Sequence, residues 1–257
     1  FEAQSNGLYS PHFDVVGPVV LSQEMAYYGK NDATGNDQYV VDFVVEACRG
    51  AKERGVDFSQ YDADNNGMVD FVYIIYAGYA ESEGAPAYVM YPHNWDLVSA
   101  LYYGYSNMDE YYANSDTDFN LPTFDGKMIN VYACSNEIKM YTDTRTGIGT
   151  ICHEFSHALG LPDFYDTDYE ENGSFSHHES YDLMCSGNYN NGGKTPPVWN
   201  AYERSIRNYV NIEEISTEGD YTLAPLMSDN VAFKMSFNND EYFILENRQQ
   251  TSWDYYL

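Results

Sequence analysis

Residues 152–166 read CHEFSHALGLPDFYD, and this stretch decides how the rest of the chain is interpreted. It contains the pattern H-E-x-x-H, formed by His153, Glu154 and His157, within a segment whose apolar spacing predicts a helix over residues 146–159. A separation of four residues puts both imidazoles on one helical face, near enough to bind one Zn²⁺ at about 2.0–2.1 Å each. Glu154 then lies beside the metal and is not a ligand.

We expect a third ligand from the residues after this helix. Gly160 allows the chain to leave the helix in a left-handed conformation, so that Asp163 can turn back toward the histidines. We expect Asp163 to be the ligand, with a fourth position open to water. Other acidic residues follow closely and leave the choice open: Asp166, Asp168, Glu170, Glu171 and Glu179.

An open metal position separates catalytic zinc sites from structural ones. Zinc lowers the pKa of a bound water to roughly 7, where Glu154 can accept its proton and return it to a leaving amine. The expected reaction is therefore hydrolysis of an amide bond. The alternative is that both histidines pack in a core and Glu154 is a solvated helix residue.

The segments before the motif predict a helix and a sheet. Apolar residues recur every three or four positions over residues 37–54, which predicts an amphipathic helix. The continuous β-branched and aromatic run 69–77 predicts a central strand buried on both faces, and residues 127–134 predict a second strand. Residues 81–125 have little periodicity and are expected to form a long loop.

The segments after the motif predict a helix and a small antiparallel lobe. The helix opens at residues 196–204, where prolines stand at its start, and the short strand patterns lie at residues 220–226, 231–237 and 241–246. We therefore expect an α/β (α+β) fold with a mixed β-sheet. The expected domains are a catalytic domain over residues 1–210, with upper and lower subdomains 1–160 and 161–210, and a β-rich lobe over residues 211–257. That lobe stops without a terminating pattern, as an incomplete lobe would.

A second metal pattern is DADNNGMVD at residues 62–70. It resembles an EF-hand loop with glycine at position 6, and its candidate calcium ligands are Asp62, Asp64, Asn66, Met68 and Asp70. Position 12, a glutamate in an EF-hand, is Tyr73, so another ligand would come from elsewhere. The alternative is a tight turn of Asx residues and glycine before a strand.

Composition limits the partners. The chain has 12 Lys and Arg against 40 Asp and Glu, a net charge of −28, which disfavours nucleic acids and anionic membrane surfaces. A hydrophobic content of 44% excludes an acidic disordered tail. No stretch approaches the roughly 20 apolar residues that span a bilayer. We expect a monomer without membrane insertion or nucleic-acid partners.

Residues 152–166, together with SYDLMCSGNYN at residues 180–190, resemble the immune inhibitor A family of secreted bacterial metallopeptidases. The similarity extends over residues 57–249. The resemblance implies a metzincin-like zinc endopeptidase that cleaves proteins or peptides. It also implies a secreted or cell-surface protein, released from a precursor by removal of a signal and a pro-segment.

The resemblance also implies roles for residues near position 184. Met184 would be the Met-turn residue, which shapes the floor of the metal site without binding the metal; the alternative is an ordinary core methionine. Some metzincins place a tyrosine two residues later to help hold the tetrahedral intermediate. That position here is Ser186, and Tyr189 is the substitute candidate.

Two other functions compete with the endopeptidase. One is a catalytically inactive, calcium-stabilised surface or adhesion module on a zincin scaffold, and the intact Glu154 argues against it. The other is an amidase or esterase that uses the same residues on a small substrate.

Overall fold

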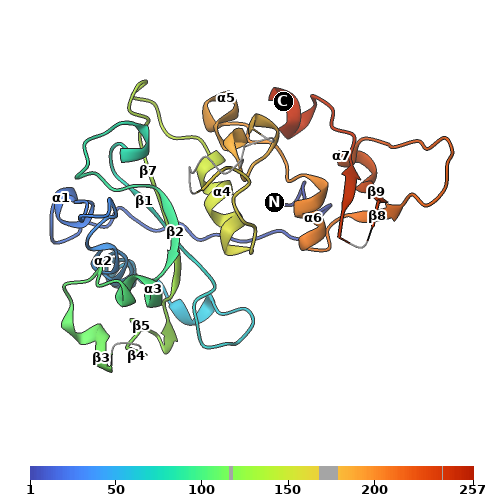
Figure 1. The fold of residues 1–257 in the computed structure, drawn as a ribbon. Coiled ribbons are helices and arrows are strands. Elements are labelled where there is room, and N and C mark those ends of the chain that lie inside the picture. Colours follow the sequence, from blue (N-terminus) through green and yellow to red (C-terminus); the bar gives the residue numbers. More distant parts are fainter. Residues whose placement is uncertain (116–117, 168–178, 239) are drawn as a thin grey trace. The chain divides into compact units, whose positions relative to one another are not determined.

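The computed structural model describes residues 1–115, 118–167, 179–238 and 240–257. The chain forms two compact units, Asp14–Thr146 and a second one made of Phe1–Phe13 with Gly147–Leu257 (Figure 1). Both contain helices and small sheets, which confirms the mixed α and β composition. Within the described ranges, no helix has the length and apolar character that crossing a membrane requires.

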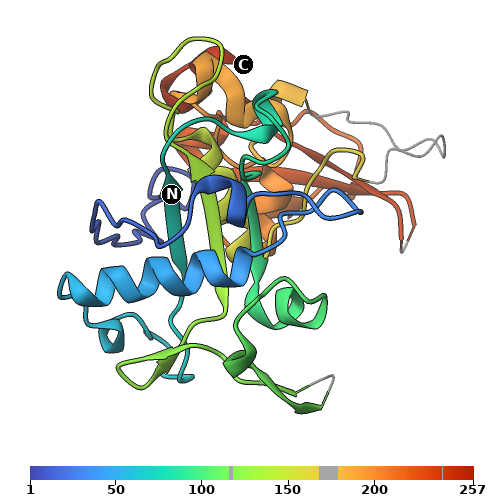
Figure 2. The same cartoon turned by 90° about the vertical axis from the view of Figure 1, so that its left-hand side faces the viewer.

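The Asp14–Thr146 unit is built on a three-stranded sheet in the order β1 (Val72–Tyr76), β7 (Val131–Asn136), β2 (His93–Asp96). Strand β7 runs parallel to β1 and antiparallel to β2. Helix α2 (Val40–Glu53) lies across one face of this sheet (Figure 2) and buries its apolar stripe there. This helix begins three residues later than predicted, because Asp37 pairs with Asn31 in an isolated antiparallel bridge.

The prediction of a central strand at residues 69–77 was wrong. Strand β1 is at the edge of the sheet and Ile75 is 55% exposed, whereas β7 is central and buried from Tyr132 onward. Ala133 and Ser135 give β7 small side chains on one face, so it lacks the bulky apolar run that suggests a central strand. The strand predicted at residues 127–134 is broken into β6 (Lys127–Met128), which pairs with β5 (Thr123–Phe124), and β7.

Residues 81–125 are not one long loop, which corrects that prediction. They include β2 and helix α3 (Leu97–Tyr102), whose Leu97 and Leu101 are part of the core. Asp96 caps α3 by accepting a hydrogen bond from the Ser99 amide at 2.8 Å. Six residues are too few for a helical period to be visible. The remaining elements of the unit are α1 (Met25–Tyr28), η1 (Phe58–Gln60), η2 (Glu81–Glu83), η3 (Asp109–Tyr111), β3 (Tyr112–Ser115) and β4 (Asp118–Phe119).

The second unit holds another three-stranded sheet, in the order β10 (Tyr242–Leu245), β9 (Val231–Ser236), β8 (Asn211–Glu214). Strand β8 pairs with β9 in parallel, so the prediction of a purely antiparallel lobe was wrong. Residues 220–226 form no strand; they lead through Pro225 into α7 (Leu226–Asp229). The acidic sequence of β8 lacks the apolar alternation that would have predicted it.

The helices of this unit are short. Besides α7, they are α4 (Gly149–Ala158), η4 (Glu179–Tyr181), η5 (Ser186–Tyr189), α5 (Asn190–Gly193), α6 (Ala201–Ile206) and η6 (Ser252–Tyr256). Helix α6 begins with a capping box in which the Asn200 side chain accepts from the Glu203 amide at 2.9 Å, and Glu203 Oε2 accepts from the Asn200 amide at 2.6 Å. Glu203 is fully buried, and burial together with the neighbouring Asp182 raises the pKa of its carboxyl well above the ordinary value.

Glu203→Gln should make the protein progressively more stable than the parent as pH rises from 5 to 8. A carboxyl whose pKa is raised by folding contributes most below its unfolded pKa of 4.5, and this contribution is lost as pH rises toward the folded value. Glutamine keeps the capping oxygen and does not ionise. Each kcal/mol gained in the free energy of unfolding should raise Tm by roughly 2–4 °C. Circular dichroism at four pH values measures Tm for the parent and the variant. A constant Tm difference across this range would contradict the prediction.

Candidate metal centre

Helix α4 carries the three residues of the H-E-x-x-H pattern. His153 and Glu154 are 6% and 8% exposed, and His157 is half-buried. The helix ends at Ala158, and Gly160 has a φ of +88°, the left-handed conformation that glycine tolerates. The amide of Leu161 then donates to the Ser156 carbonyl at 3.1 Å, so the chain turns back over the last turn of the helix.

After this turn, the side chain of Asp163 lies close to both imidazoles. Its Oδ1 lies 3.2 Å from His153 Nε2 and 3.3 Å from His157 Nε2, and the two Nε2 atoms are 3.2 Å apart. The three atoms form a nearly equilateral triangle. Ligand atoms about 2.0 Å from a tetrahedral ion are separated by about 3.3 Å, so this triangle has the size of three zinc ligands.

Two main-chain carbonyls orient the imidazoles. His153 Nδ1 lies 2.8 Å from the Leu183 oxygen, and His157 Nδ1 lies 2.8 Å from the Leu161 oxygen. A carbonyl can only accept, so each Nδ1 carries a proton and each Nε2 is free to donate its lone pair to a metal. The sequence contains no signal for these carbonyls, because any residue supplies one.

The chemistry of the donor set also fits a cation. Asp163 Oδ1 is buried and has no hydrogen-bond donor among the described residues. A carboxylate oxygen and two imidazole lone pairs this close repel one another unless a positive charge lies between them. Burial works against a charge on Asp163, but the imidazoles of His153 and His157 beside it outweigh burial and hold the pKa of Asp163 well below the usual range.

Glu154 is placed beside this triangle. Its carboxylate and the two imidazoles have ligand atoms within 4.8 Å of one another. Burial raises the pKa of Glu154, opposed by the two histidines. A raised pKa makes a carboxylate a better proton acceptor, as a general base requires.

The segment around Met184 contacts residues of the metal centre and their neighbours. Met184 is fully buried beside Leu161, Leu183 and Trp199. Its carbonyl accepts from the Phe164 amide at 2.9 Å, which ties the residue after Asp163 to this segment. The side chain of Tyr189 is 54% exposed at the end of η5.

The structure describes only some of the alternative ligands. Asp168, Glu170 and Glu171 lie outside the described residues. Asp166 and Glu179 are described, but Asp163 is the acidic residue shown in contact with both imidazoles.

The 62–70 loop brings carboxylates of Asp62, Asp64 and Asp70 within 4.8 Å of one another. Main-chain amides bond to these groups: those of Asn66 and Gly67 donate to Asp62, and that of Ala63 donates to Asp70. Lys127 Nζ also pairs with Asp62. The amide of Met68 donates to Asn66 Oδ1 at 2.8 Å. The loop is therefore stabilised by hydrogen bonds to its own Asp and Asn side chains and by one lysine, as the tight-turn alternative requires.

The first residue of α4 should tolerate no side chain. A Cβ on Gly149 would lie 1.8 Å from the Asn188 carbonyl oxygen, so Gly149→Ala must displace the helix from η5. We expect a loss of at least about 3 kcal/mol in unfolding free energy. Gly160→Ala is the matched control: its Cβ meets nothing within 4 Å, and the left-handed conformation costs about 1–2 kcal/mol. Urea unfolding measures both; equal losses would contradict the expected order.

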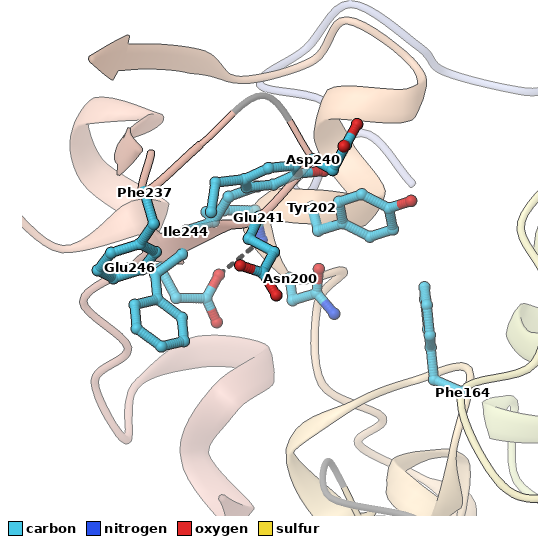
Figure 3. A pocket seen from close by; sticks show the side chains of 11 residues that line it. Phe164, Asn200, Tyr202, Phe237, Asp240, Glu241, Ile244 and Glu246 are labelled. Atoms are coloured by element: carbon cyan, nitrogen blue, oxygen red, sulfur yellow. Dashed lines mark hydrogen bonds between the residues drawn. The ribbon is translucent and has the colours of Figure 1, made fainter. Parts of the chain in front are cut away.

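A separate pocket of about 860 Å³ lies between α6 and β10 (Figure 3). Tyr202, Tyr242 and Phe243 line it, and Phe164 stands on the opposite side. None of His153, Glu154 and His157 lines this pocket.

A helix with two histidines and a glutamate, closed by an aspartate after a glycine turn, defines a centre of the metallopeptidase class. The sequence model of the immune inhibitor A peptidase M6 catalytic domain matches residues 1–210. The chain therefore belongs to this family, and the resemblance found in the sequence is confirmed.

Two curated relatives agree with this assignment. Immune inhibitor A of Bacillus thuringiensis subsp. alesti is 27% identical over 247 residues, which cover 85% of this chain and 33% of that protein. The pre-pro-metalloprotease PrtV of Vibrio cholerae serotype O1 is 25% identical over 239 residues, 84% of this chain and 24% of that protein. The chain thus spans about a third or a quarter of the length of these relatives.

Proposed function

We propose that this chain is a zinc-dependent endopeptidase that hydrolyses peptide bonds in proteins. The observation that carries the proposal is the triangle of His153 Nε2, His157 Nε2 and Asp163 Oδ1, with sides of 3.2–3.3 Å and Glu154 beside it. Family membership and the metalloprotease relative support the same class of reaction.

In this proposal, His153, His157 and Asp163 hold the zinc, which supplies a Lewis acid for amide hydrolysis when bound. Glu154 accepts a proton from the attacking water and passes it to the leaving nitrogen, so that the amine departs neutral. The carbonyls of Leu161 and Leu183 keep both imidazoles in one tautomer. Tyr189 is the proposed hydroxyl donor to the developing oxyanion.

Met184 would act as the Met-turn residue, and its burial beside Leu183 supports that role. Calcium in the 62–70 loop remains a proposal, supported by the spacing of Asp62, Asp64 and Asp70 and opposed by the Lys127 contact. The 1–210 catalytic domain is supported by the family match, which ends at the same residue. Secretion, removal of a pro-segment and a monomeric state are proposals of the same kind.

Cleavage of unfolded casein tests the proposed function. The purified chain should cleave casein internally, lose this activity to a zinc-selective chelator and regain it when zinc is restored. Fragment sizes by mass spectrometry distinguish internal cleavage from trimming at the ends. A chain that is folded and loaded with zinc and calcium yet cleaves nothing would favour the binding module.

A further inference from the structure

Three side-chain oxygens without a hydrogen-bond partner belong to one cluster in the Asp14–Thr146 unit. They are Asn31 Oδ1, Asp37 Oδ1 and Glu81 Oε2, each buried from solvent and without a donor among the described residues. The cluster lies between the turn that follows α1, the residues before α2, and η2. Buried acceptors are normally paired, so three in one place need an explanation.

Main-chain and side-chain contacts bring the three residues together. Asn31 and Asp37 face each other in an antiparallel bridge, where opposite side chains share one face with Cβ atoms about 4.5–5.5 Å apart. Asn31 Nδ2 donates to Glu81 Oε1 at 2.9 Å. Asn31 therefore links both acids, and each acid has a second oxygen that is left without a partner.

Among the described residues, no lysine or arginine forms an ion pair with Asp37 or Glu81. Asp37 is 6% exposed, and its Oδ2 accepts from the Tyr91 amide at 3.0 Å. Its ion-pair contact in the described ranges is His93 Nδ1 at 4.0 Å, but that nitrogen lies only 2.7 Å from the Tyr91 carbonyl. A buried carboxylate without a cation is costly, because it gives up hydration without gaining a partner.

We propose that Asn31, Asp37 and Glu81 bind a divalent cation of the oxygen-preferring class, with Ca²⁺ as its probe. One amide and two carboxylate oxygens are ligand types that Ca²⁺ takes, and water completes such shells. The ion would join the 31–37 turn to η2 and stabilise this part of the fold by mass action. This site is distinct from the 62–70 loop and does not depend on peptidase activity.

The competing explanation is a proton. Burial, with a contribution from Glu81, raises the pKa of Asp37 to about 7, so a protonated Asp37 could satisfy part of the cluster without any metal. Replacement of Asp37 by asparagine distinguishes the two explanations. If Asp37 is protonated, the isosteric amide replaces it without loss; if it binds a cation, the replacement removes a charged ligand.

Calcium counting by equilibrium dialysis tests the proposal. The whole zinc-loaded chain is used with Glu154→Gln, so that self-cleavage cannot interfere, at up to about 1 mM Ca²⁺. Asp37→Asn and Glu81→Gln should each bind one Ca²⁺ fewer than this parent where the parent is saturated, with affinity for that ion at least about tenfold lower. Each should also lose the calcium-dependent rise in Tm that this ion gives.

Matched controls separate this site from other acids. Glu53→Gln, an exposed acid at the end of α2, should leave the calcium count unchanged. Asp64→Asn reports on the 62–70 loop, so a calcium ion lost in this variant is counted separately from the one lost in Glu81→Gln. Glu81→Gln keeps the oxygen that accepts from Asn31 and carries the test alone if Asp37→Asn does not fold. Parent-like calcium binding in Glu81→Gln, or no calcium bound by the parent, would overturn the proposal.

Discussion

Glu154→Gln is expected to lower kcat for peptide hydrolysis by at least about 10³-fold while zinc remains at its parent level. Glutamine has nearly the same size but cannot accept a proton at its amide nitrogen. Because Glu154 is 8% exposed, bulk water is poorly placed to replace it as the base. A quenched fluorescent peptide gives kcat, and elemental analysis gives the zinc content of the same preparation.

Two comparisons make this result specific. Tyr189→Phe removes only the hydroxyl proposed to meet the oxyanion, and we expect kcat to fall by roughly 10²–10³-fold with zinc retained. Glu53→Gln, which removes an exposed charge, should leave kcat unchanged. Activity near the parent level in Glu154→Gln would refute its role as the base.

Asp163→Asn is expected to lower zinc affinity by more than about 100-fold. Loss of a residue that only hydrogen-bonds to a metal ligand typically lowers metal affinity by about 10–100-fold, so a larger loss indicates a direct ligand. The change removes the negative charge at the oxygen that lies 3.2 and 3.3 Å from the two imidazoles. At a fixed zinc excess, a 100-fold loss reduces the stabilisation by zinc by about 2.7 kcal/mol. Competition with a fluorescent chelator measures the affinity.

The neighbouring acids provide the controls for Asp163. Asp166→Asn and Glu179→Gln change the same kind of charge a few residues away and should alter zinc affinity by less than about threefold. If one of these variants loses zinc while Asp163→Asn keeps it, the third ligand has been misassigned.

The sequence predicted the metal centre better than the sheets. The spacing of His153, His157 and Asp163 is local: a helical period of 3.6 and a glycine at the helix end determine where each side chain points. The structure accordingly has α4 at the expected place and Gly160 at a φ of +88°. The ligand roles themselves remain predictions until zinc binding is measured.

Strand positions depend on contacts between distant residues, which composition does not encode. The apolar run of β1 suggested a central strand, yet β1 lies at the edge of the sheet and β7 is central, although β7 carries small residues such as Ala133. Strand β8 was missed because an edge strand can keep an acidic sequence. The roles of the Leu161 and Leu183 carbonyls could not be predicted either, because every residue type has a main-chain carbonyl.

The hydrogen bond from the Phe164 amide to the Met184 carbonyl, 2.9 Å long, has a consequence for protein engineering. It ties the residue after Asp163 to the segment whose Leu183 carbonyl orients His153, so an engineered change in either segment must leave this main-chain contact intact.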